Sequence, residues 1–105
     1  MINRKYTEEE KQIALFSKAL SNPTRVAILN FLASLDTCYF GEIHKELSIS
    51  KATVSQHLTE LKNAGLIQGK IEYPKIKYCI CKQNWIIAQK LFNDFFQKNI
   101  NETCK

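Results

Sequence analysis

The segment from Ser48 to Leu66 constrains the fold more than any other part of the chain, because it joins a short turn to a helix with an unusual outer face. At 100° per residue, Leu58 and Leu61 fall within about 40° of Val54 and form a narrow apolar stripe. Ser50 stands at the N-cap position and Gly65 at a left-handed helix stop. The opposite face carries small and polar side chains, which are Ala52, Gln56, Thr59 and Asn63. A helix buried along one line and polar outside is typical of helices that enter the DNA major groove.

The charge distribution favours the same partner. Residues 51–82 carry +4 of the chain's net charge of +5. The lysines responsible are Lys51, Lys62, Lys70, Lys75, Lys77 and Lys82. A basic concentration on one helix and the strands after it is an electrostatic footprint for phosphate, and the sequence therefore predicts a nucleic-acid partner.

Three further helices are expected before this one. Thr7 and Glu10 fit a capping box, which begins a helix that runs to about Leu20. Asn22 and Pro23 fit the cap and first position of a second helix, which is apolar nearly all round. A short helix over residues 40–47 then leads through residues 48–50 into the polar-faced helix. Two helices joined by so short a turn predict a helix-turn-helix.

After Gly65 the periodicity changes to that of strands. Residues 66–73 and 76–82 read as two strands, with Pro74 and Lys75 at the hairpin tip. In the second strand, alternation places Lys77, Cys79 and Cys81 on one face. A basic hairpin directly after a helix-turn-helix predicts a wing that rests on the DNA backbone.

A last helix is expected over about residues 83–101. Its aromatic and aliphatic stripe is wider than one small domain covers, so part of it is expected to pack on a second copy of the chain, helped by the first helix. The expected interface residues are Phe16, Trp85, Leu91, Phe92, Phe95 and Phe96. The predicted fold is mainly α with a small β-hairpin, a winged helix-turn-helix of five helices with a two-stranded wing.

Length and composition bound the remaining possibilities. The 105 residues predict a single domain over residues 1–105, and no apolar run approaches the roughly 20 residues of a membrane span. The first residues lack the apolar core of a secretory signal, so we expect a cytoplasmic protein whose four cysteines are thiols rather than disulfides. Neither a glycine-rich phosphate loop nor a nucleophile elbow is present, which argues against an enzyme.

Two separated motifs carry a resemblance to a known family. Residues 19–29, Ala-Leu-Ser-Asn-Pro-Thr-Arg-Val-Ala-Ile-Leu, and residues 50–58 followed by residues 64–67 resemble the ArsR family of bacterial winged-helix repressors. The resemblance covers about residues 7–100. It implies a homodimer built from the first helix (about 7–20) and the last (about 83–101), bound to an inverted-repeat operator in double-stranded DNA. It also implies release when an inducer, often a metal or metalloid ion, reaches the dimer.

The family's known ion sites match this chain poorly. Its zinc site needs histidines on the last helix, which has none, and its Cys-x-Cys site is replaced by Cys38-Tyr39-Phe40. The remaining candidate ion ligands are Cys79 and Cys81, which lie two residues apart on one face of a predicted strand. Because soft ions prefer thiolates, the two could hold trivalent arsenic or antimony as an inducer. Inert or packing thiols and a redox switch are the alternatives. No cofactor is required under any of these readings.

DNA contacts are assigned by position on the predicted elements. Gln56 is the candidate base reader, because its amide can pair bidentately with adenine. Thr53 and Ser55 are expected to reach phosphates or thymine methyl groups. Phosphate contacts are also expected from Ser50 and Lys51 at the helix start and from Lys75 and Lys77 on the wing. His57 is expected to be a boundary residue that bonds backbone or phosphate. Alternative functions are a thiol-redox or ligand-free repressor, or a winged-helix module that binds another protein.

Overall fold

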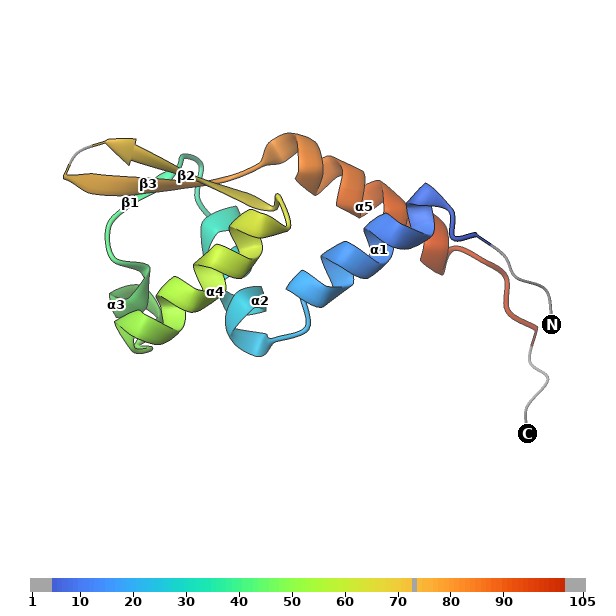
Figure 1. Ribbon diagram of the computed structural model, residues 1–105, viewed down its shortest axis with the longest axis horizontal. Coiled ribbons are helices and arrows are strands. Elements are labelled where there is room, and N and C mark those ends of the chain that lie inside the picture. Colours follow the sequence, from blue (N-terminus) through green and yellow to red (C-terminus); the bar gives the residue numbers. More distant parts are fainter. Residues whose placement is uncertain (1–4, 73, 102–105) are drawn as a thin grey trace.

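The computed structural model describes residues 5–72 and 74–101 and contains five helices and three short strands within them (Figure 1). In chain order the elements are α1 (Glu8–Ala19), α2 (Pro23–Ala33), β1 (Tyr39–Phe40), α3 (Ile43–Leu47), α4 (Lys51–Asn63), β2 (Ile67–Glu72), β3 (Lys75–Ile80) and α5 (Lys82–Phe96). This order confirms the predicted fold class, with one strand more than expected.

Helices α1 and α2 begin where their capping residues predict. Thr7 Oγ1 accepts a hydrogen bond from the Glu10 backbone N–H, and the Glu10 carboxylate accepts one from the Thr7 N–H, which completes the capping box of α1. Asn22 caps α2 through the Thr24 N–H at 2.8 Å, with Pro23 in the first position. These contacts satisfy backbone donors that a helix start leaves without partners.

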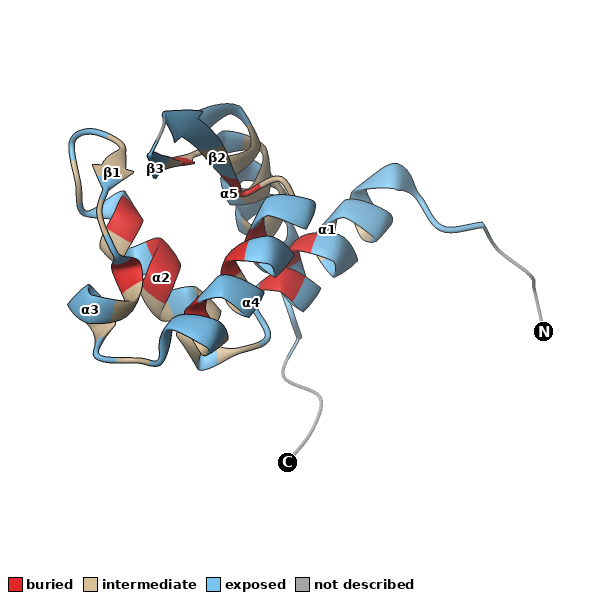
Figure 2. Cartoon of the chain, turned by 60° about the vertical axis from the view of Figure 1, so that its left-hand side comes forward, coloured by how far each residue is buried: buried red, intermediate tan, exposed pale blue. Residues whose placement is uncertain are grey.

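The core lies where α1, α2, α4 and the start of β2 meet, and Figure 2 shows the buried residues gathered on the facing sides of these helices. Ile28 of α2 and Leu61 of α4 are fully enclosed. The predicted stripe of α4 is confirmed, since Val54, Leu58 and Leu61 are its buried residues. The remaining buried apolar residues include Phe16, Ala19, Leu29, Leu32, Ile43, Ala64, Leu66 and Ile67. Burial of this stripe fixes which face of α4 remains in solvent.

The sheet is antiparallel with the order β1-β3-β2, so the wing has a third strand where no strand was expected, and its Phe40 was predicted to begin the short helix. β2 pairs with β3 from Ile67↔Ile80 to Glu72↔Lys75, and β1 pairs with β3 through Tyr39↔Tyr78 and Phe40↔Lys77. A strand of two residues carries no periodicity of its own. It forms because β3 offers an edge to pair with.

Two helix boundaries also differ from the prediction. The short helix α3 begins at Ile43 rather than at Phe40, because Phe40 belongs to β1. The last helix ends at Phe96 with Gln97 as its C-cap, so Ile100 lies beyond it. The Asn residues that follow favour turns over helix, because their side chains compete for the backbone hydrogen bonds.

The molecule is elongated, with extents of 54 × 31 × 27 Å. α1 and α5 run side by side at the end far from the wing, while α3, α4 and the β2–β3 hairpin occupy the other end (Figure 1). Within the described residues, no helix has the length and apolar character needed to cross a membrane. The two ends of the molecule therefore present different elements, a helix pair with several exposed apolar side chains at one end and a polar-faced helix beside a basic hairpin at the other.

Candidate nucleic-acid interface

The turn between α3 and α4 sets the angle of the polar-faced helix. Ser48 adopts a left-handed conformation with φ 54°, which ends α3, and the Ile49 N–H then donates to the His44 carbonyl at 3.0 Å. Two residues later Ser50 caps α4 by accepting a hydrogen bond from the Thr53 N–H. This tight reversal confirms the predicted helix-turn-helix arrangement.

Some of the side chains predicted to contact DNA are exposed to solvent, and others form hydrogen bonds within the protein. Lys51, Ser55 and Gln56 are exposed on the outer face of α4. Ser50 Oγ donates to Thr53 Oγ1 at 2.7 Å, so these two hydroxyls also act on each other to hold the helix start. The face that Gln56 occupies is therefore free to meet a base edge, while Ser50 and Thr53 have a structural role in addition to any phosphate contact.

His57 is partly buried and faces the body of the protein. An Nη1–H of Arg25 on α2 donates to His57 Nδ1 at 3.0 Å, because a guanidinium has donors only. The same guanidinium donates to the carbonyl oxygens of Ala19 at 2.6 Å and Lys18 at 3.2 Å, at the end of α1. Arg25 thus connects the end of α1 to the middle of α4, and His57 belongs to this support. In the sequence, Arg25 belongs to the motif over residues 19–29, and no local pattern predicts its contact with His57.

The end of α4 is fixed by a second polar contact that the sequence did not indicate. Gly65 has φ 82° and follows α4, as its position predicted. Asn84 Nδ2 on α5 donates to the Gly65 carbonyl at 2.8 Å. A Cβ at Gly65 would lie 2.7 Å from the same Asn84 nitrogen and would displace that side chain, and the positive φ would strain any other residue here, so both features favour glycine. Asn84 therefore joins the start of α5 to the end of the polar-faced helix.

The two predicted wing lysines differ in their surroundings. Lys75 is exposed and begins β3 next to the hairpin tip. Lys77 Nζ lies 3.3 Å from a carboxylate oxygen of Glu72 and 5.3 Å from the centre of the Phe40 ring, so it is held against the sheet. Lys70, predicted to be part of the basic footprint but not an individual contact, is exposed and pairs across the hairpin with Lys77. Lys75 and Lys70 are consequently the more available cations of the wing. Tyr73, predicted to end the first strand, lies outside the described residues.

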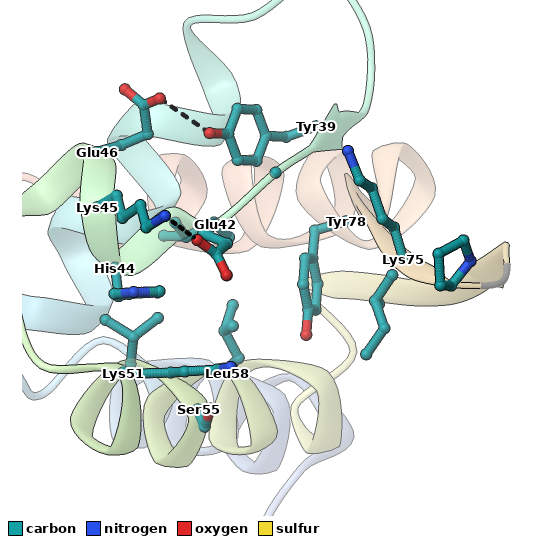
Figure 3. A pocket seen from close by; sticks show the side chains of 15 residues that line it. Tyr39, Glu42, His44, Lys45, Glu46, Lys51, Ser55, Leu58, Lys75 and Tyr78 are labelled. Atoms are coloured by element: carbon teal, nitrogen blue, oxygen red, sulfur yellow. Dashed lines mark hydrogen bonds and ion pairs between the residues drawn. The ribbon is translucent and has the colours of Figure 1, made fainter.

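A groove of about 650 Å³ separates α3 and α4 from the wing (Figure 3). Lys51 and Ser55 line it from α4, and Lys75 and Tyr78 line it from β3. Glu42, also in the lining, forms an ion pair with Lys45 at 2.6 Å, which lowers the pKa of its carboxyl group. Burial raises the pKa of Tyr78, so its hydroxyl stays protonated as a hydrogen-bond donor at neutral pH. Ammonium and hydroxyl donors on both walls suit a phosphate-bearing strand.

The cysteines are arranged differently from the prediction. Cys38 and Cys79 form a disulfide with a Cα–Cα distance of 4.5 Å, because the register Tyr39↔Tyr78 brings the preceding Cys38 opposite Cys79. The expectation of thiols throughout is therefore wrong for these two residues. β3 ends at Ile80, and Cys81 is a free cysteine at the N-cap of α5, so the expected Cys79–Cys81 site on one strand face is also not formed. Cys104 lies outside the described part of the chain.

Metal ligands do not gather elsewhere in residues 5–72 and 74–101. No three histidine, cysteine or acidic side chains within these ranges lie close enough to hold one ion. His44 lines the groove beside α4.

The residues expected at a subunit interface differ in how far they are exposed to solvent. Phe95 and Phe96 are 43% and 75% exposed on α5, and Ile86 is 62% exposed on the same helix. Trp85, Leu91 and Phe92 are partly buried against the core of the same chain. Phe16 is only 4% exposed, so the prediction that it faces a second copy is wrong. Its ring fills the core where α1 joins the body, and Leu15, 49% exposed, replaces it on the outer surface of α1.

The helix-turn-helix, its supporting helices and the β-hairpin define this chain as a winged helix-turn-helix domain. The family model for bacterial regulatory proteins of the arsR family matches residues 22–68, which span α2 to the start of β2. The chain is 34% identical over 80 residues to the HTH-type transcriptional regulator YgaV of Escherichia coli, which covers 74% of this chain and 81% of YgaV. The chain belongs to the ArsR family.

Two mycobacterial proteins extend the comparison. The HTH-type transcriptional regulator CmtR of Mycobacterium tuberculosis is 35% identical over 72 residues, which cover 68% of this chain and 59% of CmtR, so the chain matches less than two thirds of that relative's length. Its solution structure, described as a cadmium metal-sensor, has a TM-score of 0.57 at 25% identity and covers 89% of this chain and 95% of that one. A homodimeric winged helix-turn-helix domain from Mycobacterium bovis has a TM-score of 0.66 at 22% identity, covering 99% of this chain and 98% of that one.

Proposed function

We propose that this protein is a DNA-binding transcriptional repressor that acts as a homodimer on an inverted-repeat operator. The observation that carries the proposal is the exposed polar face of α4 beside a basic hairpin, with Lys51 and Lys75 on the two walls of one groove. In this arrangement α4 enters the major groove with Gln56 at a base edge, and the wing lies along the phosphate backbone. The relatives described as transcriptional regulators support the same function.

The homodimer is proposed from the arm formed by α1 and α5. Leu15, Ile86 and Phe96 are exposed apolar side chains on these two helices. The helices themselves lie side by side at the end away from the wing (Figure 1). A second copy joined there by a two-fold axis would present two α4 helices on one side of the assembly, as an inverted repeat requires. The mycobacterial domain described as homodimeric has the same fold, which supports this assembly.

Duplex binding is tested by selecting sequences from a random pool of double-stranded DNA with the full-length protein. The affinity for the selected duplex and for a scrambled duplex is then measured by fluorescence anisotropy over a range of salt concentrations. We expect the selected duplex to bind at least about 10³-fold more tightly, and both affinities to fall steeply as salt rises. Absence of salt-dependent duplex binding would favour the protein–protein module instead.

For regulation we propose a soft trivalent ion, arsenite or antimonite, as the inducer. Its ligands would be the two thiolates that reduction of the Cys38–Cys79 disulfide releases, since soft ions prefer thiolate ligands. The disulfide must be reduced first, because a bonded sulfur is not a thiolate. Arsenite added to the reduced protein–DNA complex should release the DNA, whereas zinc at equal concentration should not. A normal arsenite response of the Cys79→Ser variant would contradict this assignment.

A further inference from the structure

The arm formed by α1 and α5 contains a cavity that the proposed DNA surface does not use. It has a volume of about 440 Å³ and lies between the start of α1 and the end of α5, the two helices that run side by side in Figure 1. Small-molecule sites have volumes of roughly 300–1,000 Å³. Ile13 and Ala14 of α1 and Leu91 and Phe95 of α5 supply its apolar lining. The cavity is therefore large enough, and apolar enough, to hold a small organic molecule.

The charged groups around this cavity are mostly acidic, although the whole chain has a net charge of +5. Glu9, Glu10 and Asp94 contribute three carboxylates, and Lys98 contributes the one ammonium group of the described lining. Glu9 is exposed, and Asp94 forms an ion pair at 2.8 Å with Lys90, which lies outside the lining. The local charge therefore favours a positively charged ligand over an anion.

A cation of the chain itself already lies on the aromatic wall of the cavity. Lys98 Nζ is 4.6 Å from the centre of the Phe95 ring, which is a cation–π contact. Phe95 belongs to the last turn of α5, where the helix carbonyl groups carry partial negative charge that also favours a cation. The partial positive charge at the start of α1 is offset by its capping box and by the acidic residues of its first turn. The aromatic face is thus the place where a positive group binds.

The apolar lining decides which kind of cation fits best. The lysine ammonium group is strongly hydrated, so it gains little from leaving water for an aromatic ring. A quaternary ammonium group is a better partner for such a ring, and an attached apolar body can cover Ile13 and Leu91. Lys98 lies beyond the end of α5, and its flexible side chain can return its ammonium group to solvent when another cation takes its place.

We propose that this cavity is a binding site for organic cations that carry an apolar body, such as quaternary ammonium compounds with an aromatic or alkyl chain. The cationic group lies over Phe95 within reach of the carboxylates, and the apolar body lies between α1 and α5. The site goes beyond the proposed DNA-binding function and does not depend on it.

The proposed dimer leaves this cavity open. At 100° per residue, Phe95 lies about 40° from Leu91 around α5, whereas Ile86 and Phe96 lie about 140° from it. The exposed side chains assigned to the second copy are therefore on the other side of α5. Leu91 and Phe95 were also expected at the interface from the sequence, so the alternative occupant of the cavity is a side chain of the second copy.

Binding is tested with two probes that share one apolar body, phenylhexyltrimethylammonium and phenylhexanol. Their affinities for the full-length protein without DNA are measured by isothermal titration calorimetry, and the site is located by the backbone amide shifts in nuclear magnetic resonance. We expect the cation to bind at least about tenfold more tightly than the alcohol and to shift amides in residues 7–14 and 91–98. Equal affinities, shifts confined to other residues, or a cavity filled by the second copy so that neither probe binds would each overturn the proposal.

Two variants test the roles of the ring and of the lysine. Phe95→Ala should weaken binding of the cation about tenfold, because the aromatic face is lost. Phe40→Ala is the matched control, since Phe40 is similarly exposed and has Lys77 Nζ 5.3 Å from its ring centre, but lies outside the cavity lining. Lys98→Ala should tighten binding of the cation about threefold, because the competing ammonium group is gone, and should leave phenylhexanol nearly unchanged.

The outcomes of this experiment are separate from those of the duplex experiment. Equal losses for Phe95→Ala and Phe40→Ala, or weaker binding of the cation to Lys98→Ala, would overturn the cation site. Because no DNA is present, either result leaves the proposed function standing. A protein that binds no duplex but binds the cation in this cavity would lose the proposed function and keep the site.

Discussion

Arg25 and His57 lie on different helices, 32 positions apart in the sequence, with an Arg25 guanidinium nitrogen 3.0 Å from Nδ1 of His57. Since Arg25 can only donate, His57 must accept at Nδ1 and carry its proton on Nε2. The guanidinium also satisfies two carbonyl oxygens at the end of α1. One side chain thus fixes α4, the proposed reading helix, relative to α1, a helix of the proposed dimer interface.

Replacement of Arg25 should therefore cost more stability than replacement of His57. Arg25→Ala leaves carbonyl groups of α1 without this donor, and we expect a loss of about 1–3 kcal/mol in the free energy of unfolding. His57→Ala removes one contact and should cost less. Urea unfolding of both variants and of the double mutant measures their coupling, which should be roughly 0.5–3 kcal/mol. Strictly additive losses would show that the two side chains do not act together.

Gly65 offers a test of the junction between α4 and α5. Gly65→Ala would place a Cβ 2.7 Å from Asn84 Nδ2 at a residue with φ 82°, so we expect a destabilisation of about 1–2 kcal/mol in urea unfolding. Gly69→Ala is the matched control, because the nearest side-chain atoms to a Cβ there are 3.4 Å away. That variant should change stability by no more than about 0.5 kcal/mol. Similar losses at both positions would contradict the special role of Gly65.

The disulfide should make a measurable contribution to stability. Because its cysteines are 41 positions apart in sequence, Cys38→Ser should lower the free energy of unfolding by about 2–4 kcal/mol relative to the oxidised protein. Cys81→Ser, which removes a free cysteine, is the control and should have little effect. Urea titrations without reductant make the comparison. If adding reductant leaves the unfolding midpoint of the wild type unchanged, the covalent bond does not stabilise the fold.

Gln56 and Lys75 should affect DNA binding in different ways. Gln56→Ala should lose roughly 1–3 kcal/mol on the selected duplex and little on a scrambled one, since a base contact carries the sequence information. Lys75→Ala should weaken both and reduce the salt slope by about one unit. Lys11→Ala, on α1 at the opposite end of the molecule, is the control for charge alone. Equal losses on both duplexes for Gln56→Ala would remove it as a base reader.

The apolar surface of α5 predicts the oligomeric state. Phe96→Glu places a charge where we expect a second copy, and should convert a dimer into a monomer in analytical ultracentrifugation. Ile71→Glu, at a residue 79% exposed on the wing, is the matched control and should leave the dimer intact. Phe16→Glu is unsuitable as a test, because that residue is buried within its own chain. A wild-type protein that is monomeric at micromolar concentration would refute the proposed interface.

Most of the helices and the polar face of α4 could be predicted from the sequence. Thr7, Asn22 and Ser50 each cap a helix through a backbone N–H two or three residues further along, so the signal and its effect lie in one short segment. The stripe of α4 follows from the helical period alone. Gln56 accordingly lies where the sequence placed it, exposed on the outer face of α4. Lys75 is exposed on the wing as predicted, but it begins β3 rather than forming the hairpin tip, because it pairs with Glu72.

Only the tertiary structure decided which distant segments meet. β1 has two residues and exists because β3 pairs with it, and that register alone brings Cys38 opposite Cys79. Arg25 reaches His57, and Asn84 reaches Gly65, through helix packing that no local spacing encodes. Phe16 was predicted at the subunit interface, yet packing of α1 against the rest of the chain encloses it in the core. Local propensity determines where elements begin and end, whereas pairing and burial depend on contacts between residues far apart in the chain.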